Sequence, residues 1–259
     1  MNDTGQSVPV ELTSKRHWEE AWAVSPRLRL PSSLIIGTKN MQRVLRTEVR
    51  PGMRVLEVGC APGKILAWVA VDRGADVAGL DYSDRGIAWA RRLFEALSIS
   101  ADLRCEDLLA TTFPAASFDV VYSFGLVEHF EDPEPIVRAH VALSKPGGKV
   151  VIGVPHYGGI YGRLQRWFDP DNLAIHNVDI MSVDALTRLA PRDLASRVRA
   201  YEAGRLSPWL VSFERRLPRS VARPFAYGLN GIGLIQPMDI RALCPLLVLE
   251  ITRAAESPC

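Results

Sequence analysis

Strand-like and helix-like segments alternate along residues 53–154 of this 259-residue chain, and this alternation limits its possible folds more than any other feature. Alternating strands and helices favour parallel pairing with right-handed crossovers. We therefore expect a doubly wound α/β sheet with helices on both faces. Strands are expected at 53–58, 75–81, 101–107, 118–124 and 149–155.

Capping residues place several of the helices between these strands. A helical pattern that starts at Lys64 closes at Gly74, and Ser83 can cap the next helix. Asp132 followed by Pro133 predicts a third helix, with Asp132 as the N-cap and Pro133 at the first helical position. Each helix then has room to cross back over the sheet before the next strand begins.

The flanks of this core have a different pattern. Residues 1–50 contain a short helical segment and a longer helix, and are expected to form an N-terminal helical cap. Residues 51–259 are expected to form the main domain, with insertions at about 155–181 and 204–240 on the acceptor side. Beyond Pro155 the pattern is irregular up to about residue 181. Later expected features are a helix at 182–190, a strand at 196–202, an apolar stretch at 217–236 and a last strand at 244–253.

Composition excludes some classes of protein. Hydrophobic residues make up 47% of the chain and charged residues 23%, as in ordinary globular enzymes. The formal net charge of +2 gives no support for a nucleic-acid partner. No apolar run reaches the roughly 18 residues of a membrane span, and no N-terminal leader pattern is present. Four scattered cysteines without metal-ligand spacing suit a reducing compartment, so a cytoplasmic location is expected.

Polar and glycine residues gather where the expected strands end. Glu57 is followed by Gly59 and Gly63, which allow a tight turn and a close approach of a ligand to the backbone. Asp81 and Asp107 end the next two strands. Ligands of open parallel sheets bind at the carboxyl ends of the strands. Asp81 is placed to bind two ribose hydroxyls and Asp107 to accept from an adenine amino group, so the pattern indicates an adenosine ligand.

The spacing of the glycines separates two kinds of adenosine ligand. The pattern is Gly-x-x-x-Gly, without the G-x-G-x-x-G spacing that seats the pyrophosphate of a dinucleotide. Glu57 would repel a diphosphate, whereas it would attract the ammonium and sulfonium groups of S-adenosylmethionine (SAM). An NAD-dependent oxidoreductase is therefore disfavoured.

The run "VLEVGCAPG … GLDYS … CEDLLATTFPAASFDVVYSFGLVEHFEDP … LSKPGGKVVIGVP" resembles the class I SAM-dependent methyltransferases over about residues 52–155. The resemblance implies a Rossmann-like, mostly parallel seven-stranded sheet with an antiparallel last strand. Ala61 replaces the middle glycine of the family motif. Alanine is the smallest possible change there, and SAM binding is expected to survive it. By the resemblance, the cofactor-binding residues are Glu57, Gly59, Ala61, Gly63, Asp81, Tyr82, Asp107, Leu108 and Phe124.

The segment after the fourth strand is expected to carry the chemistry. Methyl transfer mainly requires alignment and exclusion of water, but a hydroxyl acceptor must also lose its proton. His129 is the candidate general base, and the alternative is a structural histidine that only lines the pocket. A subgroup that methylates quinone precursors uses Glu and His here, with an acid three residues earlier, to hold a metal. In this chain Glu128 and His129 are present, but Gly125 occupies the position of the earlier acid, so no metal site is expected.

Aromatic residues and histidines outside the cofactor core are the candidates for contacting the acceptor. Trp18 and Trp22 lie four residues apart on one helix face, where they would act either as a lid or as an anchor for that helix. The apolar, arginine-containing stretch 217–235 could hold a lipid-like acceptor, touch a membrane surface, pack in the core or form a dimer contact. The full set of acceptor candidates is Trp18, Trp22, His156, Tyr157, Tyr161 and His176.

The expected function is methyl transfer from SAM to a small-molecule acceptor, on a hydroxyl oxygen. An N- or carboxyl-methyltransferase and a non-catalytic SAM-binding subunit stay open as alternatives. The expected partner is a small molecule, with no nucleic acid and no transmembrane segment. Peripheral lipid contact and a homodimer stay open.

Overall fold

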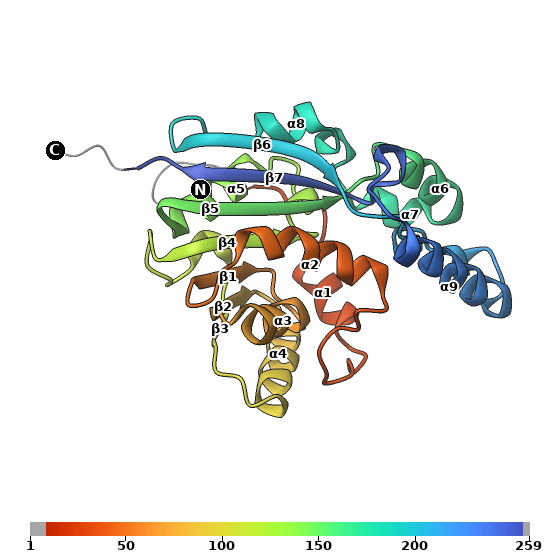
Figure 1. The fold of residues 1–259 in the computed structure, drawn as a ribbon, viewed down its shortest axis with the longest axis horizontal. Helices are drawn as coiled ribbons and strands as arrows, with labels where there is room; N and C mark the ends of the chain where they lie inside the picture. The colour runs from red at the N-terminus through yellow and green to blue at the C-terminus, as the bar shows by residue number, and fades with distance from the viewer. Residues whose placement is uncertain (1–8, 256–259) are drawn as a thin grey trace.

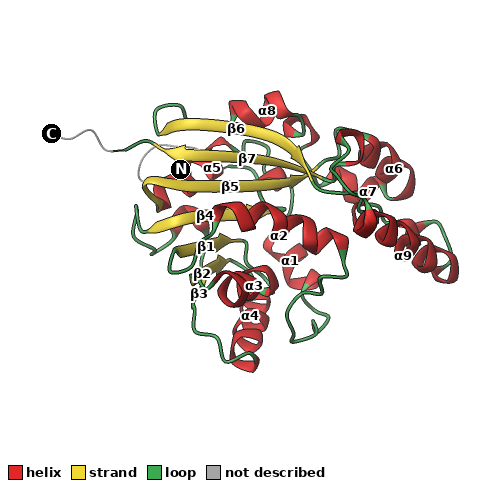
Figure 2. Cartoon of the chain, viewed as in Figure 1, coloured by secondary structure: helices red, strands yellow, loops and turns green. Residues whose placement is uncertain are grey.

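Seven strands form the central sheet of the computed structural model, which describes residues 9–255 (Figures 1 and 2). Residues 1–8 of the expected N-terminal cap and Cys259 lie outside the described residues. The strands are β1 (Arg54–Val58), β2 (Asp76–Asp81), β3 (Asp102–Cys105), β4 (Phe118–Phe124), β5 (Ser144–Pro155), β6 (Ala195–Ala203) and β7 (Leu246–Arg253).

The strand order confirms the expected fold class. The order is β3-β2-β1-β4-β5-β7-β6, and β1 to β5 pair in parallel. β7 runs antiparallel to both β5 and β6. The chain leaves β1 in one direction through β2 and β3 and returns to the other side of β1 at β4. The order therefore reverses between β1 and β4, which is where such sheets bind their ligands.

Helices cover both faces of the sheet because the buried strand residues alternate between the two faces. Val55, Val77 and Tyr122 pack under α2, α3 and α4, whereas Leu56 and Val121 pack against α5 and α8 on the other face. The helices are α1 (Lys15–Ala21), α2 (Ile36–Glu48), α3 (Lys64–Arg73), α4 (Asp84–Ala96), α5 (Glu134–Leu143), α6 (Ile160–Phe168), α7 (Pro170–Ala174), α8 (Val183–Arg188) and α9 (Arg219–Ile235).

The segment expected to be irregular after β5 is largely helical, as α6 and α7 show. Tyr161 and Phe168 of α6 pack with Phe213 and with α9 in a separate small core beyond the end of β5 (Figure 1). Burial of this apolar face stabilises helices whose composition alone does not predict them. The helix expected to begin at Pro133 begins one residue later, at Glu134. Pro133 is the N-cap of α5, and the Asp132 side chain accepts from the Glu134 amide at 3.2 Å.

Among residues 9–255, no helix combines the length and the apolar character needed to cross a membrane.

Candidate functional site

A cavity opens at the carboxyl ends of β1, β2, β3 and β4. Its empty space, including open solvent at the mouth, is about 980 Å³. Every one of these four strand ends contributes lining residues, as the alternation of strands and helices predicted. The lining residues after or at these ends are Val58, Gly59, Ala61, Leu80, Asp81, Tyr82, Glu106, Asp107, Leu108, Phe124, Gly125 and Leu126.

The N-terminal segment closes the other side of the cavity. The Leu12 amide donates to the His129 carbonyl at 2.7 Å, and the Glu131 amide donates to the Val10 carbonyl at 2.9 Å. These bonds tie the segment to the loop after β4 and set α1 over the cavity, where Trp18 and Trp22 join its wall. α1 has no fully buried residue, so it rests on the cavity rather than forming part of the core.

The two glycines of the turn after β1 have different local roles. Gly59 has φ +70° and lines the cavity, so its backbone is open to a ligand. Gly63 has φ +85° and caps α3, away from the cavity lining. A Cβ on Gly63 would lie 3.0 Å from the Cβ of Ala90, so this glycine allows α3 and α4 to pack closely.

Ala61 fits into the turn because α4 has a glycine opposite it. A Cβ on Gly86 would lie 2.6 Å from the Cβ of Ala61, so a side chain at position 86 would clash with this alanine. The Ala61 amide donates to Oδ2 of Asp81 at 3.1 Å. The departure from the family motif therefore leaves the turn intact and keeps it tied to the end of β2.

Asp81 lies at the end of β2 with both carboxylate oxygens engaged. Oδ1 accepts from the Ser83 amide at 2.9 Å, and Oδ2 accepts from Ala61. Burial raises the pKa of Asp81, and these two backbone hydrogen bonds partly offset the rise. A carboxylate can accept about four hydrogen bonds, so Asp81 retains capacity for two ribose hydroxyls.

Side chains after β2 and β3 form the region expected to hold the adenine. Burial raises the pKa of Tyr82, whose hydroxyl donates to Oε2 of Glu11 at 3.1 Å. Asp107 accepts from the Leu109 amide at 2.8 Å and thereby starts a short 3₁₀ turn with Leu108. Asp107 and Leu108 both line the cavity, as does Phe124 after β4.

Glu57 is placed differently from the other expected cofactor residues. It lies inside β1, is 6% exposed and does not line the cavity. Burial raises the pKa of Glu57 to about 8. Its Oε2 and the hydroxyl of Tyr122, its register partner on β4, have no hydrogen-bond partner among the described residues. Glu57 thus lies two residues before Gly59 with one carboxyl oxygen unpaired, and its ionised form would favour a cationic ligand group in the adjacent turn.

These features together fit SAM. The exposed backbone at Gly59 suits the amino acid part of the cofactor, and the carboxylate of Asp81 suits its sugar. The carboxyl end of β3 presents an acid and an amide to an adenine edge.

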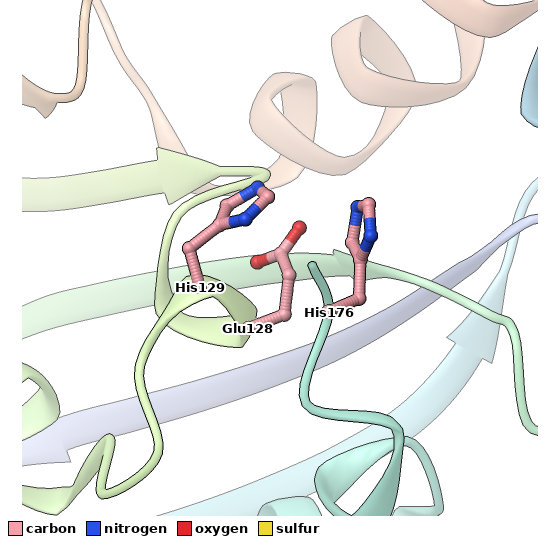
Figure 3. Close-up of side chains that lie close together, drawn as sticks. All are labelled: Glu128, His129 and His176. Atoms are coloured by element: carbon pink, nitrogen blue, oxygen red, sulfur yellow. The ribbon is translucent and has the colours of Figure 1, made fainter. Parts of the chain in front are cut away.

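A second group of polar side chains lies beside the cavity at the end of β4 (Figure 3). Glu128 and His129 belong to the 3₁₀ turn η2 (Val127–His129), and His176 follows α7. The imidazole rings of His129 and His176 are 4.7 Å apart, and Trp18 packs edge-on against His129 at 5.1 Å.

Burial sets the protonation of this group. It lowers the pKa of His129 to about 4, with a further contribution from His176, and it raises the pKa of Glu128 to about 8. The pKa of His176 is also lowered by burial. Both imidazoles are therefore neutral near pH 7. The ring of His129 is buried and packs against both Trp18 and His176.

The remaining acceptor candidates do not line the cavity. Nδ1 of His156 donates to the Cys244 carbonyl at 3.0 Å. The hydroxyl of Tyr157 donates to the Leu210 carbonyl at 3.0 Å, and that of Tyr161 to the Leu243 carbonyl at 2.8 Å. These bonds join the segment after β5 to the segment between β6 and β7. Tyr157 also contacts His176, with their rings 5.3 Å apart.

Several lining residues were not anticipated from the sequence. Glu11 and Thr13 carry no motif, and only their pairing with the loop after β4 brings them to the cavity. Glu106 precedes Asp107 and could have been found as a second acid at the end of β3. Phe130 and Ile136 enclose the end of the cavity near His129, and their apolar character gave no signal of a ligand site.

Comparison with known proteins agrees with this geometry. Residues 56–152 match the family described as "Methyltransferase domain". A ubiquinone biosynthesis O-methyltransferase of Azoarcus sp. (strain BH72) is 40% identical over 101 residues, which cover 38% of this chain and 42% of that protein. Phosphoethanolamine N-methyltransferase 3 of Arabidopsis thaliana is 33% identical over 105 residues, covering 40% of this chain and 21% of that protein. The chain therefore spans less than half the length of these curated relatives.

Solved structures resemble the chain over a longer range. Phosphoethanolamine N-methyltransferase 2 of Haemonchus contortus, solved with phosphomonomethylethanolamine and S-adenosylhomocysteine, aligns with a TM-score of 0.62 at 17% identity. The alignment covers 93% of this chain and 58% of that one. At this identity the likeness concerns the fold.

Proposed function

We propose that this chain, which contains a class I SAM-dependent methyltransferase domain, methylates a hydroxyl oxygen of an apolar small molecule. The observation that carries the proposal is the division of one cavity into two ends. The ends of β1, β2 and β3 suit the cofactor, whereas the loop after β4 presents His129 beside apolar walls.

One end of the cavity holds the methyl donor, and the other end holds the acceptor and the groups that help to remove its proton. SAM supplies a methyl group on a sulfonium, so the acceptor oxygen forms a C–O bond while the C–S electron pair stays on sulfur. Asp81 and the turn at Gly59 hold the cofactor, and Trp18 and Trp22 exclude water from above. The acceptor hydroxyl must also lose its proton. The groups able to assist that loss, Glu128, His129 and His176, lie together at the acceptor end.

The charge of the cavity argues for oxygen over a phosphorylated amine as the acceptor. Its lining includes the acids Glu11, Asp81, Glu106 and Asp107, but no lysine or arginine. A phosphate-bearing acceptor, such as the one named for the phosphoethanolamine relatives, would find no cationic partner there.

The walls near His129 further narrow the acceptor. Trp18, Leu126, Phe130 and Ile136 are apolar and suit a ring or a hydrocarbon. An apolar molecule with one reactive hydroxyl, such as a phenol, is the acceptor class that these walls and this charge favour. The ubiquinone biosynthesis relatives are named as O-methyltransferases, which agrees with this choice.

A methyl-labelled SAM assay on the purified chain tests the proposal. Substituted phenols should become methylated, whereas phosphoethanolamine and simple carboxylic acids should not. Asp81→Ala serves as the control that ties turnover to the cofactor site. Methylation confined to amines or to carboxylates would refute the proposal.

A further inference from the structure

Three side chains with metal-binding atoms lie together beside the cavity. One ring nitrogen each of His129 and His176 and one carboxylate oxygen of Glu128 all lie within 4.8 Å of one another. Figure 3 shows the Glu128 carboxylate close to the two imidazole rings at the end of β4. Glu128 and His129 are adjacent in the chain, but His176 comes from the segment after β5 and is brought to them by the fold.

Glu128 is a buried acid with one unpaired carboxyl oxygen. It is 1% exposed, and its Oε2 has no hydrogen-bond partner among the described residues. A buried carboxylate in this state is costly unless a cation or a donor satisfies it. One ring nitrogen of each histidine lies within 4.8 Å of a carboxylate oxygen, so the orientation of the two rings decides whether they can bind an ion together with Glu128.

Both histidines are oriented as metal ligands usually are. Nδ1 of His129 lies 3.0 Å from the Ile175 carbonyl, and Nδ1 of His176 lies 2.7 Å from the Asn172 carbonyl. A carbonyl oxygen can only accept, so each Nδ1 carries the proton and each Nε2 carries a lone pair. A backbone carbonyl bound to one ring nitrogen is the common way to hold the other ready for a metal.

We propose that Glu128, His129 and His176 bind one divalent transition-metal ion such as Zn²⁺. Two imidazoles and one carboxylate suit such ions, whereas Mg²⁺ and Ca²⁺ prefer oxygen ligands alone. Ligands around a tetrahedral zinc ion are about 3.4 Å apart, given bond lengths near 2.1 Å. The three atoms lie within 4.8 Å of one another, so binding an ion would draw them closer together.

Gly125 connects this site with the cavity. It lines the cavity, and a Cβ built on it would lie 3.6 Å from Oε1 of Glu128. The missing side chain leaves an approach by which an acceptor can reach the ion. Three protein ligands leave at least one coordination position open. The sequence suggested that Gly125 removes a metal ligand, but the structure supplies a third candidate ligand, His176, from another segment.

The role of the ion rests on the proposed function. An ion in this position lowers the pKa of an acceptor hydroxyl that reaches it, and the proton leaves to bulk water before the C–O bond forms. In that arrangement His129 is a ligand of the ion and not the general base.

Zinc binding by the full chain tests the site without any acceptor. The protein is treated with a chelator and dialysed, and Zn²⁺ is titrated in competition with a chromogenic chelator. We expect one equivalent with micromolar or tighter affinity, and at least tenfold weaker binding in Glu128→Gln and His176→Ala. His156→Ala is the matched control, because its Nδ1 also bonds a backbone carbonyl but its ring lies outside the cluster. It should bind zinc as the parent does.

Calorimetry with S-adenosylhomocysteine shows whether each variant is folded. Failure of the folded parent to bind one equivalent of zinc would overturn the proposal, as would unchanged binding in both Glu128→Gln and His176→Ala. Zinc binding by a chain that methylates no hydroxyl would support the site and remove the proposed function. Hydroxyl methylation by a chain that binds no zinc would support the proposed function and remove the metal site.

Discussion

Glu57 and Glu128 are two buried acids at neighbouring strands, and they differ in what surrounds them. Both are less than 7% exposed, burial raises the pKa of each to about 8, and each has an Oε2 without a partner among the described residues. Glu57 lies within β1 beside the hydroxyl of Tyr122, which can donate. Glu128 lies after β4 beside two imidazoles whose Nδ1 protons are already committed to carbonyls.

The difference shows how the two ends of the cavity are built. The cofactor end is made from strand ends that follow one another in the chain, and its acid can be neutralised by a proton. The acceptor end is assembled from separate segments, and its acid faces lone pairs. A carboxyl group among lone pairs is stabilised by a cation or by a proton of its own, whereas Glu57 lies beside a hydroxyl that can donate, so the two carboxyls should respond differently to the same substitution.

The largest expected effect is on turnover. Glu128→Gln should lower hydroxyl methylation by about 10²–10⁴-fold, the range for losing a group that helps to remove a proton. The affinity for S-adenosylhomocysteine should stay within about twofold. Glu57→Gln, which keeps the same shape in the other acid, should lower turnover by less than tenfold at saturating SAM. Turnover is measured by initial rates. Equal losses of turnover in both variants would contradict the different roles assigned to Glu128 and Glu57.

Cofactor affinity should show the next largest effect, and only at the cofactor end. Asp81→Ala should weaken SAM binding by about 1.5–3 kcal/mol, because two charge-assisted hydrogen bonds to the ribose are lost. Calorimetry measures this change. Asp81→Asn is the matched variant, since its amide oxygen can still accept from a backbone amide. If neither substitution alters SAM affinity, Asp81 serves only to fix the turn through Ala61 and Ser83.

The pH dependence of stability reports on the buried acids together, and a Glu57 variant separates the contribution of Glu57. Because the folded-state pKa of about 8 lies above the ordinary value of 4.5, the folded protein binds more protons than the unfolded chain between these values. The free energy of unfolding should therefore fall as pH rises from about 4.5 to about 8. Glu57→Gln should remove part of this fall, roughly 1–3 kcal/mol across the window. Urea unfolding at several pH values tests it, and parallel curves for parent and variant would contradict it.

The smallest expected effect concerns α1. Trp18 packs edge-on against His129, a contact worth about 0.5–1.5 kcal/mol, so Trp18→Ala should raise the acceptor KM by roughly two- to tenfold. Trp167→Ala, at a 57%-exposed tryptophan of α6, is the control and should leave the KM unchanged. A lower melting temperature with an unaltered KM would instead show that Trp18 anchors α1.

The cofactor end could be predicted because its information is local. A strand that ends in Asp81 places that acid at the sheet edge, whatever the rest of the chain does. The turn at Gly59 follows from the same logic. Two expected cofactor residues do not line the cavity, because Glu57 lies inside β1 and Gly63 caps α3.

The acceptor end could not be predicted because it depends on long-range packing. His176 is 47 residues from His129 in the sequence, and they meet only because α6 and α7 fold against the segment before α9. Glu11 reaches the cavity through a bridge to Phe130, which no local pattern encodes. Helix α9 contains Pro224 and three glycines, so its helical form comes from packing rather than propensity.

The antiparallel strand β7 has a consequence for how such a chain can change. Ala203 at the end of β6 and Leu246 at the start of β7 are paired, so the 42 residues between them leave and rejoin the sheet at one point. An arm attached in this way can be lengthened, shortened or exchanged as a unit, since its two anchors stay adjacent. Recombination at this junction could replace the whole arm in a single genetic event, with the SAM-binding strand ends inherited unaltered.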